Sequence, residues 1–544
     1  FSARLAICET ARANIDMYRA GPPMMPIRQR ARLRSAIRVN KEDFSVPLIT
    51  EELIVPPVQP NAMADTQPFV AKAEFQEALG FPGELVENWQ QVALDKMSEL
   101  IGKYRALPVF LDACVKCGAC TDKCHYYLGT GDPKNMPVAR QDLMRSVYRR
   151  YFTIAGRYFP KLVGAQDLTK EVLEDWYRYY HQCSECRRCS VYCPYGIDTA
   201  EITMAGREIL ASVGLGQKYA NEIIAKVHKV GNNLGLPGPA LANTLEQLEE
   251  EVEEDVNVKV RFPLDQSGAE VLLVTPSADF FAEPHVDGLI GYAKVFHQAG
   301  ISWTLSSHAS EAANFGIFIG NYEQMKKVAE RIRQAALDLG VRRIVIGECG
   351  HAWRVAYSYW NTLIGPFDFL DPNYPAPQHV CELTYDLIQH GTLKLDPSRN
   401  NDKVLTFHDS CNVSRASRMG SEPGGQFKLP REIIKAACNH FVDMASETTH
   451  EQTFCCGGGG GLLTDDVMEL RVKGALPRMT ALKQVVESHG VTHMAAICAI
   501  CKSQFAKVLP VYGFDMDMVV SVHQLVGDAL IFDGKAAPLG NELN

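Results

Sequence analysis

Two adjacent cysteines, Cys455 and Cys456, run directly into five glycines, Gly457 to Gly461. Adjacent thiols rarely bridge to each other, because a disulfide would strain the peptide between them. They can instead present two thiolates to neighbouring metal atoms. Glycines carry no Cβ, so the backbone can pass close to a bulky inorganic group. The segment predicts a metal-cluster site, against the simpler interpretation of a glycine-rich loop beside buried, inert cysteines.

Three more cysteines accompany this pair in the C-terminal part of the chain. Cys411 stands upstream, at the end of the sequence His408-Asp409-Ser410-Cys411, and Cys498 and Cys501 form a CxxC pair downstream. The resulting pattern, C…CC…CxxC, gathers five thiols in one domain.

Two further cysteine sets share the spacing CxxCxxCxxxC and carry the strongest signal in the chain. They comprise Cys114, Cys117, Cys120 and Cys124, and then Cys183, Cys186, Cys189 and Cys193 followed by Pro194. This is the pattern of bacterial ferredoxins with two [4Fe-4S] clusters, in which the fourth cysteine of each set binds the other cluster. That rule assigns Cys114, Cys117, Cys120 and Cys193 to one cubane, and Cys183, Cys186, Cys189 and Cys124 to the second. Zinc sites use separate CxxC pairs, not interlocked sets of four.

The first set departs from the pattern at one position and is followed by a long insert. His125 stands where a proline would follow the fourth cysteine, a change that removes no ligand. The two sets are separated by 58 residues, and the stretches 140–150 and 172–180 have helical patterns. The sequence therefore predicts an α-helical ferredoxin module.

The elements that must position the C-terminal cysteines alternate between strands and helices. Short apolar runs at 271–274, 344–346, 404–407 and 494–497 predict buried parallel strands. A helical pattern covers 322–339. Loops after the carboxyl ends of such strands are where α/β folds place their chemistry. We predict a duplicated domain whose second copy kept its ligands, and whose first copy retains only Cys349 in the loop equivalent to that of Cys498.

Composition limits the class of protein. The chain has 544 residues, 46% of them hydrophobic and 22% charged, with a net charge of −9. This favours three or four globular domains, and nothing in it points to nucleic acid. Of 17 cysteines, thirteen fall in the patterns above, and no secretory signal is visible. Such spacing indicates metal ligation rather than a disulfide framework. No apolar run approaches the roughly 18 residues that span a bilayer.

We therefore expect an α+β multidomain protein, an α-helical two-cluster ferredoxin module followed by two α/β domains. The predicted parts are an extended, basic N-terminal arm that binds a partner or a membrane surface (1–62), a helical segment (63–112), the ferredoxin module (113–200), a helical connector (201–265), a degenerate α/β domain (266–395) and a cysteine-rich α/β domain (396–544). Because Met63 resembles a chain start, residues 1–62 are also open to interpretation as a processed or foreign segment.

The C…CCG…CxxC pattern resembles the cysteine-rich CCG domain of the heterodisulfide reductase family. The order of modules resembles its HdrD-like subunits. The first cysteine set with the stretch Tyr126 to Pro137 after it, and a first copy reduced to Cys349, resemble the DsrK family of the membrane-bound DsrMKJOP complexes over about residues 63–544. This resemblance implies a noncubane [4Fe-4S] cluster on Cys411, Cys455, Cys456, Cys498 and Cys501, beside two cubane clusters. It implies no second unusual cluster, because no cysteine pair stands near Ala313 to Gly316. Cys349 is either an extra ligand or substrate contact, or a buried inert thiol, and His351 and His408 are candidates to tune the site.

The same resemblance implies a function in dissimilatory sulfur metabolism. Such a protein reduces, or reversibly oxidises, the disulfide or trisulfide of a DsrC-like carrier protein with electrons from a DsrM-like haem b subunit that oxidises quinol. It would lie at the cytoplasmic face of the inner membrane, attached through that subunit and the other DsrMKJOP subunits. Two alternatives remain. One is the iron–sulfur subunit of a flavin-dependent glycolate, lactate or glycerol-3-phosphate dehydrogenase, and the other is a non-catalytic electron-transfer subunit.

Overall fold

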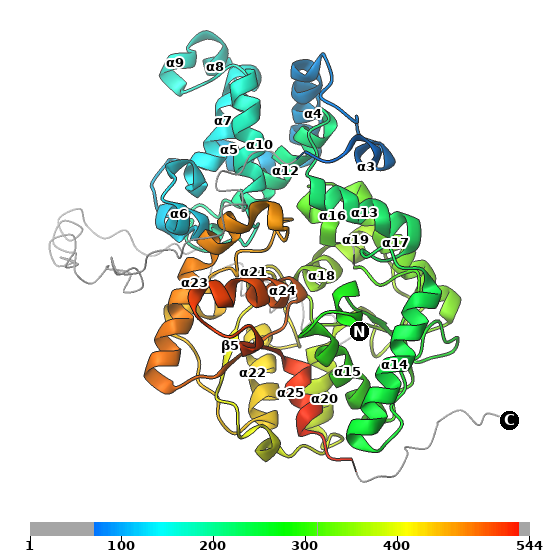
Figure 1. The fold of residues 1–544 in the computed structure, drawn as a ribbon. Helices are drawn as coiled ribbons and strands as arrows, with labels where there is room; N and C mark the ends of the chain where they lie inside the picture. The colour runs from blue at the N-terminus through cyan, green and yellow to red at the C-terminus, as the bar shows by residue number, and fades with distance from the viewer. Residues whose placement is uncertain (1–69, 313, 533–544) are drawn as a thin grey trace, which may run out of the picture. The chain divides into compact units, whose positions relative to one another are not determined.

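The computed structural model describes residues 70–312 and 314–532, all of which belong to one of the two units into which the chain divides, Leu53–Asn544. The predicted arm at residues 1–62 and Ala313 lie outside the described residues. The architecture is mixed, with a helical part followed by two parallel sheets, as predicted (Figure 1). No helix within the described ranges is both long and apolar enough to cross a bilayer.

The helical part has one apolar core. Its larger helices are α4 (Trp89–Lys103), α5 (Ala106–Ala113), α7 (Pro137–Phe152), α10 (Lys170–His181) and α12 (Thr199–Ser212). In α4, Ala93, Met97 and Leu100 recur at the helical period and are fully buried against Trp176 of α10 and Ile209 of α12. Helix α12 therefore shares this core, although its sequence lies largely in the stretch predicted as a connector.

The first sheet is parallel, in the order β2-β1-β3-β4. Its strands are β1 (Val271–Val274), β2 (Trp303–Thr304), β3 (Arg343–Ile346) and β4 (Gln378–His379). The long helices between them are α15 (His285–Ala299) and α17 (Tyr322–Leu339), and α20 (Val380–Gln389) follows β4. The acidic helix α14 (Gly238–Val256) buries Leu241, Leu245, Leu248 and Val252 in the core of this sheet and exposes its carboxylates.

The second sheet repeats the plan with the order β5-β6-β7, again parallel. Its strands are β5 (Leu405–His408), β6 (His493–Ala496) and β7 (Val519–Ser521). A single parallel bridge from Leu405 to Phe441 stands where β2 stands in the first sheet. The long helices are α22 (Gly425–Ala437) and α23 (Met468–His489), and α25 (Val522–Ala529) follows β7. The predicted strands 404–407 and 494–497 were each displaced by one residue.

The two sheet domains are joined by helices of each half that pack on helices of the other. Helix α15, from the first half, packs on α25 from the second, and α22 from the second packs on α20 from the first. The approach is close, since a Cβ added to Gly291 of α15 would lie 1.9 Å from the carbonyl oxygen of His523 in α25. This reciprocal packing is consistent with the prediction that the two halves are copies of one domain.

The helical part is bound to the second sheet domain by α6 (His125–Thr130), which packs along α23. Glycines make this contact possible. A Cβ on Gly129 would lie 1.7 Å from the Lys473 carbonyl oxygen, and one on Gly474 would lie 2.3 Å from the Tyr126 ring. The Tyr126 hydroxyl also donates to the Gly457 carbonyl oxygen at 2.8 Å. The segment after the first cysteine set is thus fixed against the glycine run of the C-terminal domain.

Candidate functional site

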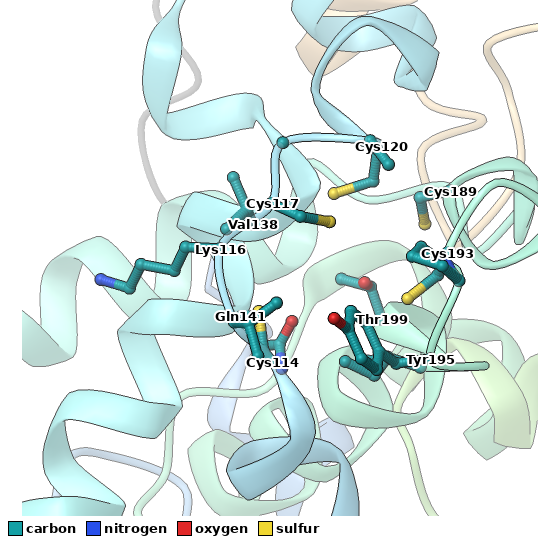
Figure 2. A pocket seen from close by; sticks show the side chains of 15 residues that line it. Cys114, Lys116, Cys117, Cys120, Val138, Gln141, Cys189, Cys193, Tyr195 and Thr199 are labelled. Carbon is teal, nitrogen blue, oxygen red and sulfur yellow. The ribbon is translucent and has the colours of Figure 1, made fainter. Parts of the chain in front are cut away.

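The first group of thiols surrounds a pocket near the surface of the helical part. Figure 2 shows Cys114, Cys117, Cys120 and Cys193 around one hollow, with Cys189 beside Cys193. Cys117 is exposed, whereas Cys114 is buried. These four thiols are the set that the ferredoxin rule assigns to one cubane.

The second group lies deeper, around the guanidinium of Arg140. Cys124, Cys183 and Cys189 all interact with this buried cation. Burial opposes ionisation of Cys124, but Arg140 and His125 outweigh it, so the pKa of this thiol lies below its usual value. Cys186, the fourth member assigned by the rule, lies instead beside Cys455 of the third group.

The third group joins the five C-terminal cysteines in one buried network of thiols. Cys455 contacts Cys411 and Cys456, Cys456 contacts Cys501, and Cys501 contacts Cys498. The neighbouring thiols of Cys186, Cys411 and Cys456 hold the pKa of Cys455 well below its ordinary value and outweigh the opposing effect of burial. The backbone also supplies a donor, because the Gly457 N–H lies 3.4 Å from the Cys455 sulfur.

Cys349 belongs to this network as well. Its thiol lies beside that of Cys498. Each of the two cysteines follows a strand and stands immediately before a helix, Cys349 before α18 (Gly350–Val355) and Cys498 before α24 (Ala499–Val508). Nδ1 of His351 lies 3.7 Å from the Cys498 sulfur. His408 lies edge-on to the Phe505 ring, and burial lowers its pKa to about 3.

The second and third groups are tied together by side chains that cross between the domains. His125 is hydrogen-bonded on both sides of its ring: Nδ1 donates to the Gly474 carbonyl oxygen at 2.7 Å, and Nε2 lies 2.7 Å from the Ser184 hydroxyl oxygen. Arg415 donates to the carbonyl oxygens of Cys186 and Glu451, each at 2.6 Å. These long-range bonds hold the second cysteine set against the C-terminal loops, and no local sequence signal predicts them.

The glycine run passes between these groups with almost no clearance. A Cβ on Gly460 would lie 2.5 Å from the Cys183 carbonyl oxygen, and one on Gly459 would lie 3.2 Å from Nε2 of His351. The atoms that exclude a side chain here belong to the ferredoxin loop and to the first α/β domain. The glycines therefore let three parts of the chain meet at the thiols.

A buried ionic network, missed at the level of sequence, supports the loops that carry Cys349 and Cys501. Nζ of Lys502 lies 3.2 Å from Glu348, and both side chains are fully buried. The other carboxylate oxygen of Glu348 accepts from the backbone N–H of His523 at 2.8 Å and lies 2.7 Å from Nδ1 of its ring. Lys502 outweighs burial and holds the pKa of Glu348 at about 2. In the sequence, the only indication of this network is that Glu348 and Lys502 each stand directly beside a cysteine.

The donor set and the unpaired groups around it fit an iron–sulfur cluster. Among residues 70–312 and 314–532, no three His, Cys, Asp or Glu side chains converge on a point for a single metal ion. Thiolates of a cluster bind different iron atoms, so they are spread more widely. In the same part of the chain, Nε2 of His351, both ring nitrogens of His408 and the Ser410 hydroxyl are buried without a hydrogen-bond partner. A bound inorganic group would give them one.

Comparisons with known proteins agree with this chemistry. Residues 110–197 match the family described as the 4Fe-4S dicluster domain. The chain is 40% identical to an Hdr-like menaquinol oxidoreductase iron-sulfur subunit of Archaeoglobus profundus, over 87% of this chain and 89% of that protein. It is 39% identical to the second iron-sulfur subunit of the Hdr-like menaquinol oxidoreductase of Archaeoglobus fulgidus, over 82% and 84%. It is 24% identical to one polypeptide of the dihydromethanophenazine:CoB–CoM heterodisulfide reductase of Methanosarcina barkeri, over 60% and 72%.

Proposed function

The chain belongs to the family of Hdr-like menaquinol oxidoreductase iron-sulfur subunits, and from that membership we propose that it passes electrons between menaquinol and a sulfur substrate. In this proposal a DsrM-like haem b subunit oxidises the quinol, and the chain lies against it at the cytoplasmic face of the membrane. The substrate is the disulfide or trisulfide of a DsrC-like carrier protein, which is the role of a DsrK-type subunit. Two cubane clusters and one noncubane cluster would serve it.

The observation that carries the proposal is the order of the three thiol groups. The first has an exposed member, Cys117, and the last is wholly buried. The second lies between them, because Cys189 lines the pocket of the first and also lies beside Cys183. Contact between Cys186 and Cys455 then reaches the third. The arrangement suits a route from a surface donor to an internal reaction site.

Reduction of an S–S bond to two thiols needs two electrons and two protons. When bound, a cluster on Cys411, Cys455, Cys456, Cys498 and Cys501 would supply electrons one at a time and an iron atom able to bind sulfur. The protein excludes water from this place, since each of these five side chains is at most 2% exposed. His351 lies beside Cys498 with Nε2 unpaired among the described residues, in position to contact a substrate sulfur or its proton.

The network of Glu348 and Lys502 holds the loops that carry Cys349 and Cys501 in fixed positions relative to each other. The Ala499 N–H donates to the Glu348 carbonyl oxygen at 2.8 Å, so the loops after β3 and β6 are bonded to each other. Glu348 and Lys502 are each adjacent in sequence to a cysteine of the network. Their pairing therefore positions Cys349 and Cys501 from opposite halves of the duplicated domain.

Spectroscopy of the anaerobically purified complex tests the proposal. We expect about twelve iron atoms per chain, four for each of three clusters. Oxidised wild-type protein treated with a thiol should develop a new paramagnetic signal, which the Cys455→Ala variant should lack. Cys438→Ala is the matched control, because Cys438 is equally buried but lies outside the three groups. A thiol-induced signal that survives in Cys455→Ala excludes the C-terminal thiols as the reaction site.

A further inference from the structure

The tip of the insert between the two cysteine sets is the most apolar exposed feature of the described chain. It consists of α8 (Ile154–Tyr158) and α9 (Pro160–Val163), which project beyond the end of α7 (Figure 1). Ile154 is 80% exposed, Tyr158 75%, Phe159 63% and Leu162 84%. Elsewhere within residues 70–312 and 314–532, no large apolar side chain is more than 59% exposed. Four such residues within nine positions form a surface that needs explanation.

The tip is held in this shape by specific contacts. Gly156 lets α8 fold back on α7, because a Cβ there would lie 1.8 Å from the Arg149 carbonyl oxygen. Arg149 donates to the Val163 carbonyl oxygen at 2.6 Å, and Arg157 donates to that of Tyr151 at 2.9 Å. With the backbone bonded in this way, the apolar side chains are presented outward by the fold.

The tip is also positively charged. Residues 143–166 include five basic residues and no acidic one. Arg150 is neutralised by Asp167, with Nε 2.6 Å from the carboxylate. Arg149, Arg157 and Lys161 form no ion pair with any carboxylate of the described residues. The apolar side chains are therefore surrounded by unneutralised cations.

We propose that this tip, residues 153–163, inserts into the interfacial region of an anionic lipid bilayer. Apolar and aromatic side chains flanked by Lys and Arg are the combination that binds this region, where the cations meet lipid phosphates and the apolar groups reach the acyl chains. A narrow, convex tip also suits a fluid surface, which needs no complementary hollow. The inference goes beyond the proposed function, because it concerns direct contact with lipid and does not depend on the sulfur substrate.

This contact would orient the thiol groups relative to the membrane. Gln141, near the start of α7, lines the pocket of the first thiol group, and Ile154 follows the other end of the same helix. Thirteen residues at the rise of an α-helix place them roughly 20 Å apart. The exposed thiol group would then stand about one helix length above the lipid headgroups, on the side from which a membrane partner supplies electrons.

Flotation with lipid vesicles tests the proposal on the full-length holoprotein. The Ile154→Ser/Leu162→Ser and Arg157→Glu/Lys161→Glu variants should each bind vesicles of phosphatidylcholine and phosphatidylglycerol roughly tenfold more weakly than the wild type. The wild type should bind anionic vesicles more tightly than purely zwitterionic ones, and the Arg157→Glu/Lys161→Glu variant should lose this preference. Met516→Ser, which removes an exposed apolar side chain elsewhere, should bind normally. Unchanged iron content shows that each variant is folded.

A reporter at the tip separates this contact from binding by another part of the chain. In a Leu162→Trp variant, brominated lipids should quench the fluorescence of the introduced indole. Vesicle binding without quenching would overturn the proposal. So would variants that bind vesicles normally but no longer co-purify with a membrane subunit, since the tip would then dock on protein. Equal binding by the wild type and both double variants would overturn it as well.

Discussion

Asp279 is a buried acid whose charge the fold compensates poorly. Its side chain accepts a hydrogen bond from the Thr275 hydroxyl, while its other carboxylate oxygen has no partner among the described residues. Burial raises the pKa of this carboxyl to about 7, with Glu348 and Glu311 adding repulsion and Lys502 acting in the opposite direction. The folded protein therefore binds a proton that the unfolded chain would release near pH 4.

A pH dependence of stability follows from this raised pKa. The stabilising proton is fully present below the unfolded pKa and is lost as the pH rises through about 7. Relative to the wild type, Asp279→Asn, which cannot ionise, should gain about 3 kcal/mol of stability between pH 5 and pH 8.5, because the wild type loses its proton over the two pH units up to about 7. Denaturant midpoints of the anaerobic holoprotein at both pH values provide the measurement. The exposed Asp338→Asn control should show no such divergence, and a pH-independent difference for Asp279→Asn would contradict the assignment.

His125 shows what a local pattern can and cannot predict. The cysteines of each ferredoxin set are grouped by short spacings, and four thiols around one pocket could be anticipated from them. The reason why a histidine, His125, stands in place of proline could not be predicted from the sequence. Its ring bonds Gly474, which lies 349 residues away, and Ser184 in the second cysteine set. Only the folded chain brings these partners together, and the same is true of the contact between Cys186 and Cys455.

At the scale of elements, the strands that could be predicted were those of four residues. β1 is a fully buried apolar run, and in β3 the three residues Ile344 to Ile346 form another, a pattern that predicts a buried strand. β2 and β4 have two residues each, too few for any periodicity to emerge. The packing of α15 on α25 is likewise invisible in sequence, since it follows from the arrangement of two separate sheets.

At the scale of elements, the close packing of α6 on α23 depends on glycine. Gly129→Ala would place a methyl group against the backbone of Lys473, where only separation of the two helices makes room. We expect a loss of about 3 kcal/mol of stability, as for severe overpacking. Gly102→Ala, in α4, meets nothing within 4 Å and should be neutral or stabilising by about 0.5 kcal/mol. Unfolding midpoints with iron content measure both, and equal midpoints would show that the helices do not need this close approach.

At the scale of the whole molecule, three thiol groups occupy a helical module and the two α/β parts that carry the parallel sheets. Each group draws residues from parts of the chain far apart in sequence. The exposed group lies in the helical module, and the buried one lies where the two α/β halves meet. Under the proposed function, this separates the place where electrons would arrive from the place where a substrate would react. This separation also predicts that the C-terminal group depends on the first group for reduction by quinol.

Removing the exposed thiol tests that dependence. In the Cys117→Ser variant of the membrane-bound complex, a menaquinol analogue should no longer reduce the centre held by the C-terminal thiols, because the route begins at the pocket of Cys117. Dithionite, a small reductant, should still reduce it. Cys455→Ala should behave in the opposite way, with the two ferredoxin centres reduced by quinol and the C-terminal centre missing. Freeze-quench paramagnetic resonance distinguishes these states. If quinol still reduces the C-terminal centre of Cys117→Ser at the wild-type rate, electrons enter at another face of the molecule. The spatial order of the three thiol groups would then not be the order in which electrons pass through them.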